Sequence, residues 1–212
     1  MLIQFSALAE LADRLDGVET PLANRWELVE ESFESWVDRP DLLGTLRSHL
    51  LNLPPEQADE VSSRSRETTT HFAWCLRDVP GEQFTFWLHE YKPQQDWRPG
   101  YADSVHNHRY HFCTTIVRGG YLHEAFQADL DPITGMITSV ALQRSATCEV
   151  GAIGSMLSSE FHRIPLAHDD TLTFLVKSRP VTPWSLSFDP VTGVGHRHVP
   201  VESRLGELAS GL

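Results

Sequence analysis

Residues 100–120 read Gly100-Tyr-Ala-Asp-Ser-Val-His106-Asn-His108-Arg-Tyr-His111-Phe-Cys113-Thr-Thr-Ile-Val-Arg-Gly119-Gly120. Residues i and i+2 of a β-strand point to the same face, so His106 and His108 are expected to present two imidazoles to one cavity. A metal ion binds imidazole nitrogen at about 2.0–2.1 Å. Two ligands make a weak site, and the best candidate for the third is His162, in a later strand-like segment.

The length and composition bound the kind of protein. With 212 residues, the chain is long enough for one large domain or for one domain with a helical extension. No segment approaches the roughly 18 apolar residues that a membrane helix needs. The formal net charge of −12 disfavours nucleic acid and anionic lipid. We therefore expect neither nucleic acid nor membrane as a partner.

The cysteines indicate a reducing compartment. Cys75, Cys113 and Cys148 show no paired spacing, which argues against a disulfide framework. Residues 1–5 have neither a basic region nor a cleavage site, so we expect no secretory signal. A cytoplasmic protein is the resulting expectation.

Residues 1–65 are predicted to form a helical N-terminal extension that packs on a β core. Ser6 is the expected cap of the first of three helices. Apolar residues recur at helical spacing in each: Leu8, Leu11 and Leu15; Trp26, Val29, Phe33 and Trp36; Leu43, Leu46 and Leu50. We interpret these stripes as core rather than as a ligand-binding box. Residues 57–68 are polar and are predicted to be a linker.

Residues 66–200 are predicted to be all β, and residues 201–212 a tail or a short helix. Short segments rich in Thr, Val, Phe, Trp and Tyr alternate with Gly, Pro and Asp turns. Such a pattern is typical of an antiparallel sandwich or barrel. The predicted strands cover residues 69–78, 83–92, 104–109, 111–118, 120–127, 137–144, 146–150, 161–167, 170–177 and 184–189.

The spacing of Gly100, His106-x-His108, Cys113 and Gly120 resembles the first cupin motif, with Cys113 where most cupins have a glutamate. The resemblance implies a cupin double-stranded β-helix, or jelly-roll, barrel that holds a metal inside. A cysteine at this place is similar to the cysteine dioxygenase branch, whose iron is bound by three histidines. Phe161-His162-Arg163-Ile164 is similar to the segment that supplies the third histidine there.

Other features of that branch are changed in this chain. Its Ser-x-His-x-Tyr run is replaced by Thr173-Phe-Leu175-Val-Lys177, so Lys177 stands where the family has the tyrosine that can join the motif cysteine. Arg77 is nearest in sequence to the family's carboxylate-binding arginine and does not align with it cleanly. The resemblance thus carries over the metal site, but not the residues specific for cysteine.

Three neutral imidazoles leave the charge of a divalent metal uncompensated. Such a site favours an anionic substrate donor, and the lack of a ligating carboxylate argues against a 2-oxoglutarate oxygenase. A mixed ligand set with Asp103 or Glu124 remains open. Imidazole also suits zinc, nickel and copper, so Fe(II) rests mainly on the resemblance, with Zn, Ni and Mn as alternatives.

Further residues are candidates for the site. Tyr110 is expected on the ligand face, and Cys113 is retained as a catalytic candidate from the motif. Lys177 is either a buried proton donor or charge partner, or a solvated residue at a strand end. Candidates for a substrate carboxylate and for the cavity mouth are Arg98, Arg109 and Arg118, and Trp87, Trp97, Tyr101 and Trp184. No site role is expected for His71, His89, His123, His168, His196 and His198.

The preferred prediction is a mononuclear non-haem iron(II) dioxygenase that oxidises a small anionic, thiol or amino-acid-like metabolite with O2. The alternatives are a non-oxidative metal-dependent cupin (isomerase, lyase or hydrolase) and a non-catalytic ligand-binding cupin. The partners expected are the small-molecule substrate and O2. A homodimer paired through sheet edges also remains open.

Overall fold

A layer of helices at the N-terminal end of the chain precedes the first strand. A computed structural model describes residues 7–100 and 103–212; the predicted cap Ser6 and the predicted mouth residue Tyr101 lie outside the described residues. The helical elements are α1 Ala7–Asp16, the 3-10 helix η1 Leu22–Arg25, α2 Trp26–Val37, α3 Leu42–Leu51 and α4 Pro55–Arg64.

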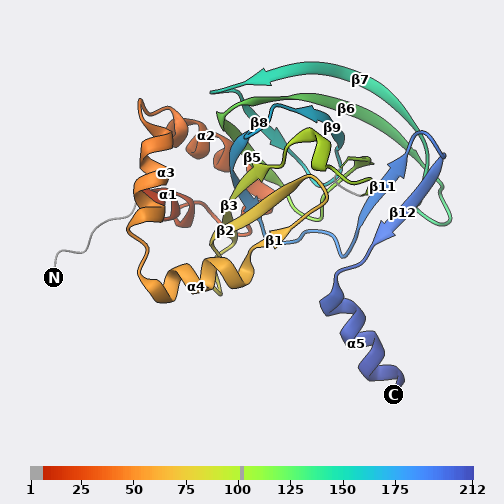
Figure 1. Ribbon diagram of the computed structural model, residues 1–212. Helices are drawn as coiled ribbons and strands as arrows, with labels where there is room; N and C mark the ends of the chain where they lie inside the picture. Colours follow the sequence, from red (N-terminus) through yellow and green to blue (C-terminus); the bar gives the residue numbers. More distant parts are fainter. Residues whose placement is uncertain (1–6, 101–102) are drawn as a thin grey trace.

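The strands that follow pair into two antiparallel sheets (Figure 1). One sheet has the order β1-β2-β3-β10-β5-β8, and the other has the order β12-β11-β4-β9-β6-β7. The strands are β1 Arg66–Glu67, β2 His71–Arg77, β3 Phe84–Tyr91, β4 Val105–His106, β5 Phe112–Arg118, β6 Gly120–Leu130, β7 Ile137–Glu149, β8 Ile153–Met156, β9 Phe161–Ala167, β10 Leu172–Ser178, β11 Ser185–Asp189 and β12 Val194–His198.

Successive strands cross repeatedly from one sheet to the other. β4 lies in the second sheet and β5 in the first, and β8, β9, β10 and β11 alternate between the two sheets in the same way. This winding is that of a jelly-roll barrel. The predicted mainly β fold with a helical N-terminus is therefore confirmed, and the cavity of the barrel lies between the two sheets.

The first sheet separates the helices from the cavity, and β10 shows how. Phe174 and Val176 are fully buried in the cluster that the sheet forms with the helices. Thr173, Leu175 and Lys177 alternate with them and line the cavity. This alternation follows from the two-residue period of a strand, so one strand contributes both to the core and to the wall of the site.

The predicted apolar stripes of the helices form the other side of this core. Leu11, Phe33 and Trp36 are among the fully buried side chains of the helical layer. The ring of Phe174 stacks on Phe33 at 6.0 Å and lies 5.4 Å from Trp36. Burial of large aromatic side chains contributes much of the packing energy, so these contacts fasten the helices to the barrel.

A glycine makes the tight turn between β5 and β6. Gly119 has φ of +73°, a conformation that side chains rarely adopt. A Cβ added there would lie 2.5 Å from Thr171 Oγ1. Glycine is thus required both by the backbone conformation and by the close approach of the neighbouring segment.

Several predicted elements differ from the observed ones. The predicted linker 57–68 is wrong over most of its length, because α4 runs to Arg64 with Pro55 in its first turn, where the missing N–H costs nothing. The predicted strands 137–144 and 146–150 are one continuous strand, β7. β8 and β12 were not predicted, and the predicted strand 104–109 is reduced to the two residues of β4.

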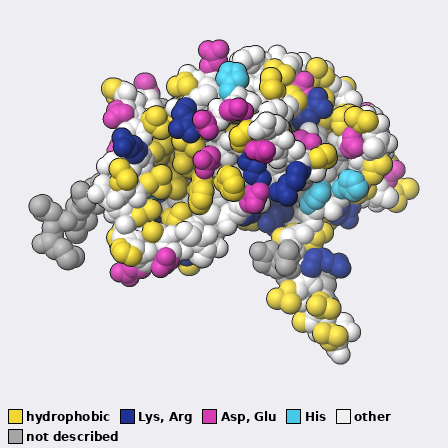
Figure 2. Space-filling view, viewed as in Figure 1, with side chains coloured by type: hydrophobic (Ala, Val, Ile, Leu, Met, Phe, Trp, Pro, Cys, Tyr) yellow, Lys and Arg dark blue, Asp and Glu magenta, His cyan; other side chains and the backbone are white. Residues whose placement is uncertain are grey.

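The chain ends in helix α5, Val201–Gly211, which projects from the barrel (Figure 1). Its described side chains are exposed, and Figure 2 shows apolar groups along it, among which Leu205 and Leu208 belong to the exposed residues. In the described part of the chain, no helix combines the length and the apolar character needed to cross a bilayer.

Candidate metal centre

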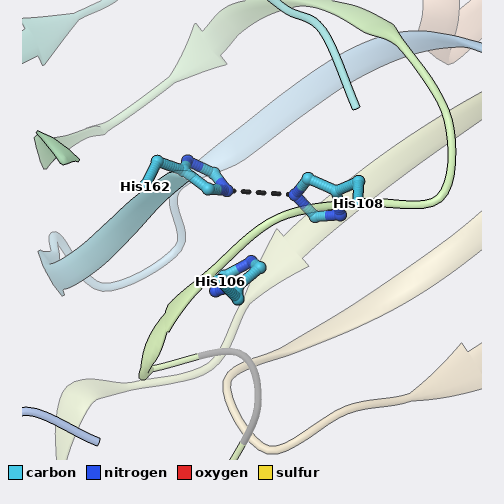
Figure 3. A group of neighbouring side chains, drawn as sticks. All are labelled: His106, His108 and His162. Carbon is cyan, nitrogen blue, oxygen red and sulfur yellow. Dashed lines mark hydrogen bonds between the residues drawn. The ribbon is translucent and has the colours of Figure 1, made fainter. Parts of the chain in front are cut away.

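Three histidines from two neighbouring segments converge inside the barrel (Figure 3). His106 ends β4 and is directly opposite His162 of β9 in the antiparallel pair. His108 follows β4 in the loop, and its Nε2 lies 3.0 Å from His162 Nε2. One nitrogen from each residue lies within 4.8 Å of the others, so the three residues can hold one metal ion.

The residue between the first two histidines fixes their loop. Asn107 is buried, and its side-chain amide donates to the carbonyl oxygen of Ser158 at 2.9 Å. Its Oδ1 accepts from the backbone N–H of Leu186 at 2.7 Å. The backbone N–H of Asn107 also donates to the carbonyl oxygen of Leu186 at 3.1 Å, so these bonds together hold the second imidazole in place without a longer strand.

Hydrogen bonds also select the nitrogen that each imidazole offers. His106 Nδ1 lies 2.9 Å from the carbonyl oxygen of Ser104, and since a carbonyl only accepts, Nδ1 carries the proton. The lone pair of His106 is therefore on Nε2. His162 Nδ1 lies 3.1 Å from His123 Nε2, which orients the ring whose Nε2 faces His108.

Burial keeps these imidazoles neutral. It lowers the pKa of His106 to about 4, although the hydrogen bond to the Ser104 carbonyl acts in the opposite direction and raises this pKa. Desolvation, reinforced by neighbouring imidazoles, holds the pKa of His108 and of His162 well below 6.5. A neutral imidazole is the form that binds a metal, so the donor set fits a cation such as Fe(II), Zn(II) or Ni(II) without first losing protons.

Neither carboxylate of the mixed-ligand alternative joins this cluster. Asp103 Oδ1 accepts from the backbone N–H of Gly100 at 2.6 Å. Glu124 forms an ion pair with Arg163 at 2.6 Å. In the described ranges 7–100 and 103–212, only His106, His108 and His162 form a group of His, Cys, Asp or Glu with this geometry.

Replacing His123, the hydrogen-bond partner of His162, is expected to weaken metal binding. His123→Ala removes the contact to His162 Nδ1 and should reduce metal affinity by about 10–100-fold, the usual effect of losing such a partner. Titration of the apo protein with Fe(II) or Zn(II) measures this. The control is His196→Ala, since His196 is exposed. An unchanged affinity of His123→Ala would show that His162 needs no support from this side.

The cavity around the centre has a volume of about 740 Å³ and is lined from both sheets. Besides the three converging histidines, it is lined by four more and by four cationic side chains. These residues are His71, His89, His123 and His198, and Arg66, Arg109, Arg144 and Lys177. The described lining contains no Asp or Glu.

Two of the three predicted catalytic residues lie in this cavity. Tyr110 stacks on the ring of His108 at 5.2 Å and shares its side of the cavity as predicted, although residues 107–111 are a loop and not the predicted strand. Lys177 is 3% exposed, so the alternative of a solvated lysine is wrong. Cys113 faces the other way, into the cluster shared with the helices, where its Sγ contacts Ser155 Oγ at 3.9 Å.

Of the predicted arginines, only Arg109 lines the cavity. Arg77 forms an ion pair with Glu82, and Arg98 forms one with Glu67 at 3.1 Å. Arg118 Nε donates to the backbone carbonyl of residue 170 at 2.9 Å. The predicted mouth aromatics Trp87 and Trp97 pack in core clusters beside the cavity rather than on its surface.

The remaining histidines of the cavity were not predicted from the sequence. His89 lies two residues from both Trp87 and Tyr91 on β3, and this spacing indicates a shared face once the strand is known to border a site. His198 was assigned no role, yet β12 pairs with β11 and brings its Nε2 to 2.7 Å from Ser187 Oγ. No local sequence pattern indicated that His198 lines the cavity, because β12 itself was not predicted.

Comparisons with known proteins find distant structural similarity only. No family model matches the sequence, and no curated protein resembles it. Ectoine synthase from P. lautus is similar over 58% of this chain and 76% of its own, at 14% identity and a TM-score of 0.38. KdgF from Halomonas sp. is similar over 55% and 87%, at 12% identity and a TM-score of 0.37.

A 7S globulin from Momordica charantia is similar over 64% of this chain and 35% of its own, at 14% identity and a TM-score of 0.39. This chain therefore spans about a third of the globulin. Similarities at this distance assign neither a family nor an activity to the chain.

Proposed function

We propose that this chain is a metal-dependent enzyme of the cupin type and, more precisely, a mononuclear non-haem iron(II) dioxygenase that acts on a small anionic metabolite. The observation that carries the proposal is the convergence of three neutral imidazoles, two buried and one half-buried, with no described carboxylate in the cluster. Bound iron(II) would supply redox chemistry toward O2, with the substrate as the source of electrons.

The chain's own residues would bind, orient and shield the reactants. His106, His108 and His162 supply the donors, and the cavity beside them leaves room for a small molecule. Tyr110 stacks on one face of the His108 ring and would help to orient that ligand. The imidazole-only donor set leaves the positive charge of a divalent metal in a low-dielectric cavity, which favours an anionic donor from the substrate.

A second function is favoured by a different observation. Lys177 and Tyr110, two side chains that can carry a proton, line the same cavity as the imidazoles. With Zn, Ni or Mn at the centre, such groups would serve a non-oxidative isomerase, lyase or hydrolase, in which the metal polarises the substrate. The two proposals differ in whether O2 is consumed.

Metal content and oxygen consumption separate these functions. Protein purified with and without air should contain about one iron per three-histidine cluster, and it should consume O2 in the presence of a small thiol or amino acid from a panel. Zinc or nickel at the same stoichiometry, without oxygen consumption, would favour the non-oxidative enzyme. Protein that binds no metal after incubation with each ion would contradict both and leave a non-catalytic binding protein.

A further inference from the structure

The most unusual charge in the cavity is a buried amine on β10. Lys177 is 3% exposed, and its Nζ lies 4.3 Å from the centre of the Trp87 ring and 5.2 Å from that of Tyr110. Its hydrogen-bond partner is His89 Nε2, at 3.1 Å. An imidazole and two aromatic faces are weak partners for an ammonium group withdrawn from water.

The described residues provide no counter-charge for this amine. None of the ion pairs among them includes Lys177, and no described carboxylate lines the cavity. Arg66 approaches the same indole, at 5.4 Å from the Trp87 ring, and adds a like charge. A chain with 29 acidic and 17 basic residues thus surrounds a cavity that is cationic.

Burial of an ionised amine costs free energy unless an opposite charge accompanies it. Desolvation lowers the pKa of Lys177 well below 10.5, and the positive charge of Arg66 lowers it further. A negatively charged ligand would remove both penalties, because it supplies an acceptor and the missing charge at once. The arrangement is therefore suited to an anion that enters from the cavity.

We propose that Lys177 anchors a carboxylate, as a singly charged group, of a small ligand, with Arg66 at the edge of the cavity as a second cation. That this ligand is the substrate rests on the proposed function; the anion site itself does not need the metal. One buried amine matches one negative charge at this subsite, whereas a doubly charged group would bring a second charge with no buried partner there.

The surroundings of Lys177 also indicate the body of the ligand. Phe112, Met156 and Leu175 form an apolar wall of the cavity. The ring of Tyr110 lies between the metal cluster and the amine, 5.2 Å from the His108 ring and 5.2 Å from Lys177 Nζ. The ligand class is thus a carboxylic acid. Its apolar part should be about as large as one aromatic ring and should lie between Lys177 and the metal centre.

Paired probes that differ only in charge test this proposal. Calorimetric titration compares 3-phenylpropionate with 3-phenylpropanamide, which has the same shape and no charge. The wild-type protein should bind the acid at least about 10-fold more tightly than the amide, the effect of one charge-assisted hydrogen bond. Lys177→Met, which keeps the length of the side chain, should abolish this preference. The proposal would be overturned if Lys177→Met preferred the acid over the amide as strongly as the wild type does. It would also be overturned if the wild-type protein showed no preference for the acid.

Matched variants guard against indirect effects. Arg98→Gln removes an exposed surface cation that is paired with Glu67, and it should leave the preference unchanged. Arg66→Gln, also at an exposed residue, should reduce the preference in part, and it gives a second test if Lys177→Met fails to fold. If the Arg66 and Arg98 variants lose the preference equally, the effect is one of general surface charge, and the proposal fails.

Ligand binding by a metal-free variant tests this proposal independently of the proposed function. In His162→Ala the preference for the acid should persist, because Lys177 lies on another strand and contacts His89 instead. Loss of the preference together with the metal would mean that the carboxylate binds the metal, which overturns the role of Lys177. Tighter binding of 2-phenylethylphosphonate than of the acid would contradict a singly charged group at Lys177.

Discussion

Replacing His162 by alanine is expected to remove the bound metal and the activity that depends on it. His162 supplies one of three donors and also faces His108 at 3.0 Å, so its loss leaves two imidazoles and one disturbed contact. The metal affinity should fall by more than the roughly 10–100-fold that follows loss of an outer hydrogen-bond partner. Metal analysis after dialysis and anaerobic titration with Fe(II) measure the change.

The control for this prediction is the matched change at an exposed histidine. His196→Ala removes an imidazole of β12 that is not among the residues lining the cavity, in contrast to His198 of the same His-x-His pair. It should retain the metal content of the wild type. Circular dichroism should show the same β signal for both variants. Wild-type metal affinity in a folded His162→Ala protein would disprove the three-histidine centre.

Replacing Phe174 by alanine is expected to lower the free energy of unfolding by about 3–5 kcal/mol, the usual cost of such a cavity in a core. Phe174 is fully buried and contacts the rings of Phe33, Trp36 and Phe86. The first two belong to α2 and the third to β3, so one side chain connects the helices to the barrel. Its loss should loosen that connection.

Urea unfolding of the metal-free protein measures this effect without the stability that a bound ion adds. Leu51→Ala is the matched control, because Leu51 lies on α3 with 73% of its surface exposed, and it should change the free energy of unfolding by less than about 0.5 kcal/mol. A loss below about 1 kcal/mol in Phe174→Ala would mean that the helices stabilise the barrel little.

Periodicity was sufficient to predict most of the β fold. The segment 161–167 was predicted with the bounds that β9 has, since its apolar and β-branched residues stand between clear turn signals. The apolar faces of the helices were predicted equally well, because the spacing of the leucines and aromatic residues places them on one face of each helix, and that face is buried. Strand placement alone does not select the third histidine, because His71, His89 and His123 also lie on predicted strands; the similarity of residues 161–164 to the segment that supplies the third histidine in the resembled family selects His162.

The local structure around His106 and His108 shows the limit of that reasoning. Both imidazoles reach the same centre, as predicted, but only His106 lies on a strand. His108 is placed by the bonds of Asn107 to segments far away in the sequence. Such long-range hydrogen bonds cannot be inferred from the local sequence pattern. The prediction therefore placed both histidines at the correct site, but it assigned His108 to a strand that is not there.

The orientation of Lys177 and Cys113 depended on which side of each strand the helices cover. Cys113 alternates with Phe112 on β5, and only the position of the helical layer decides which of the two faces the cavity. Lys177 alternates with Val176 on β10 in the same way. A strand that is buried on both faces does not alternate between apolar and polar residues. Periodicity therefore could not show which face of β5 or β10 borders the cavity.

The two-sided use of β10 has a consequence for how this chain tolerates insertions and deletions. Deleting one residue within Leu172–Ser178 would exchange the faces of the strand beyond that point, bringing a charged amine toward the helices and an apolar side chain toward the histidines. The exposed turn at residues 131–135 between β6 and β7 carries no such constraint. Changes of length should therefore accumulate at the tip of that hairpin, while β10 keeps its residue count.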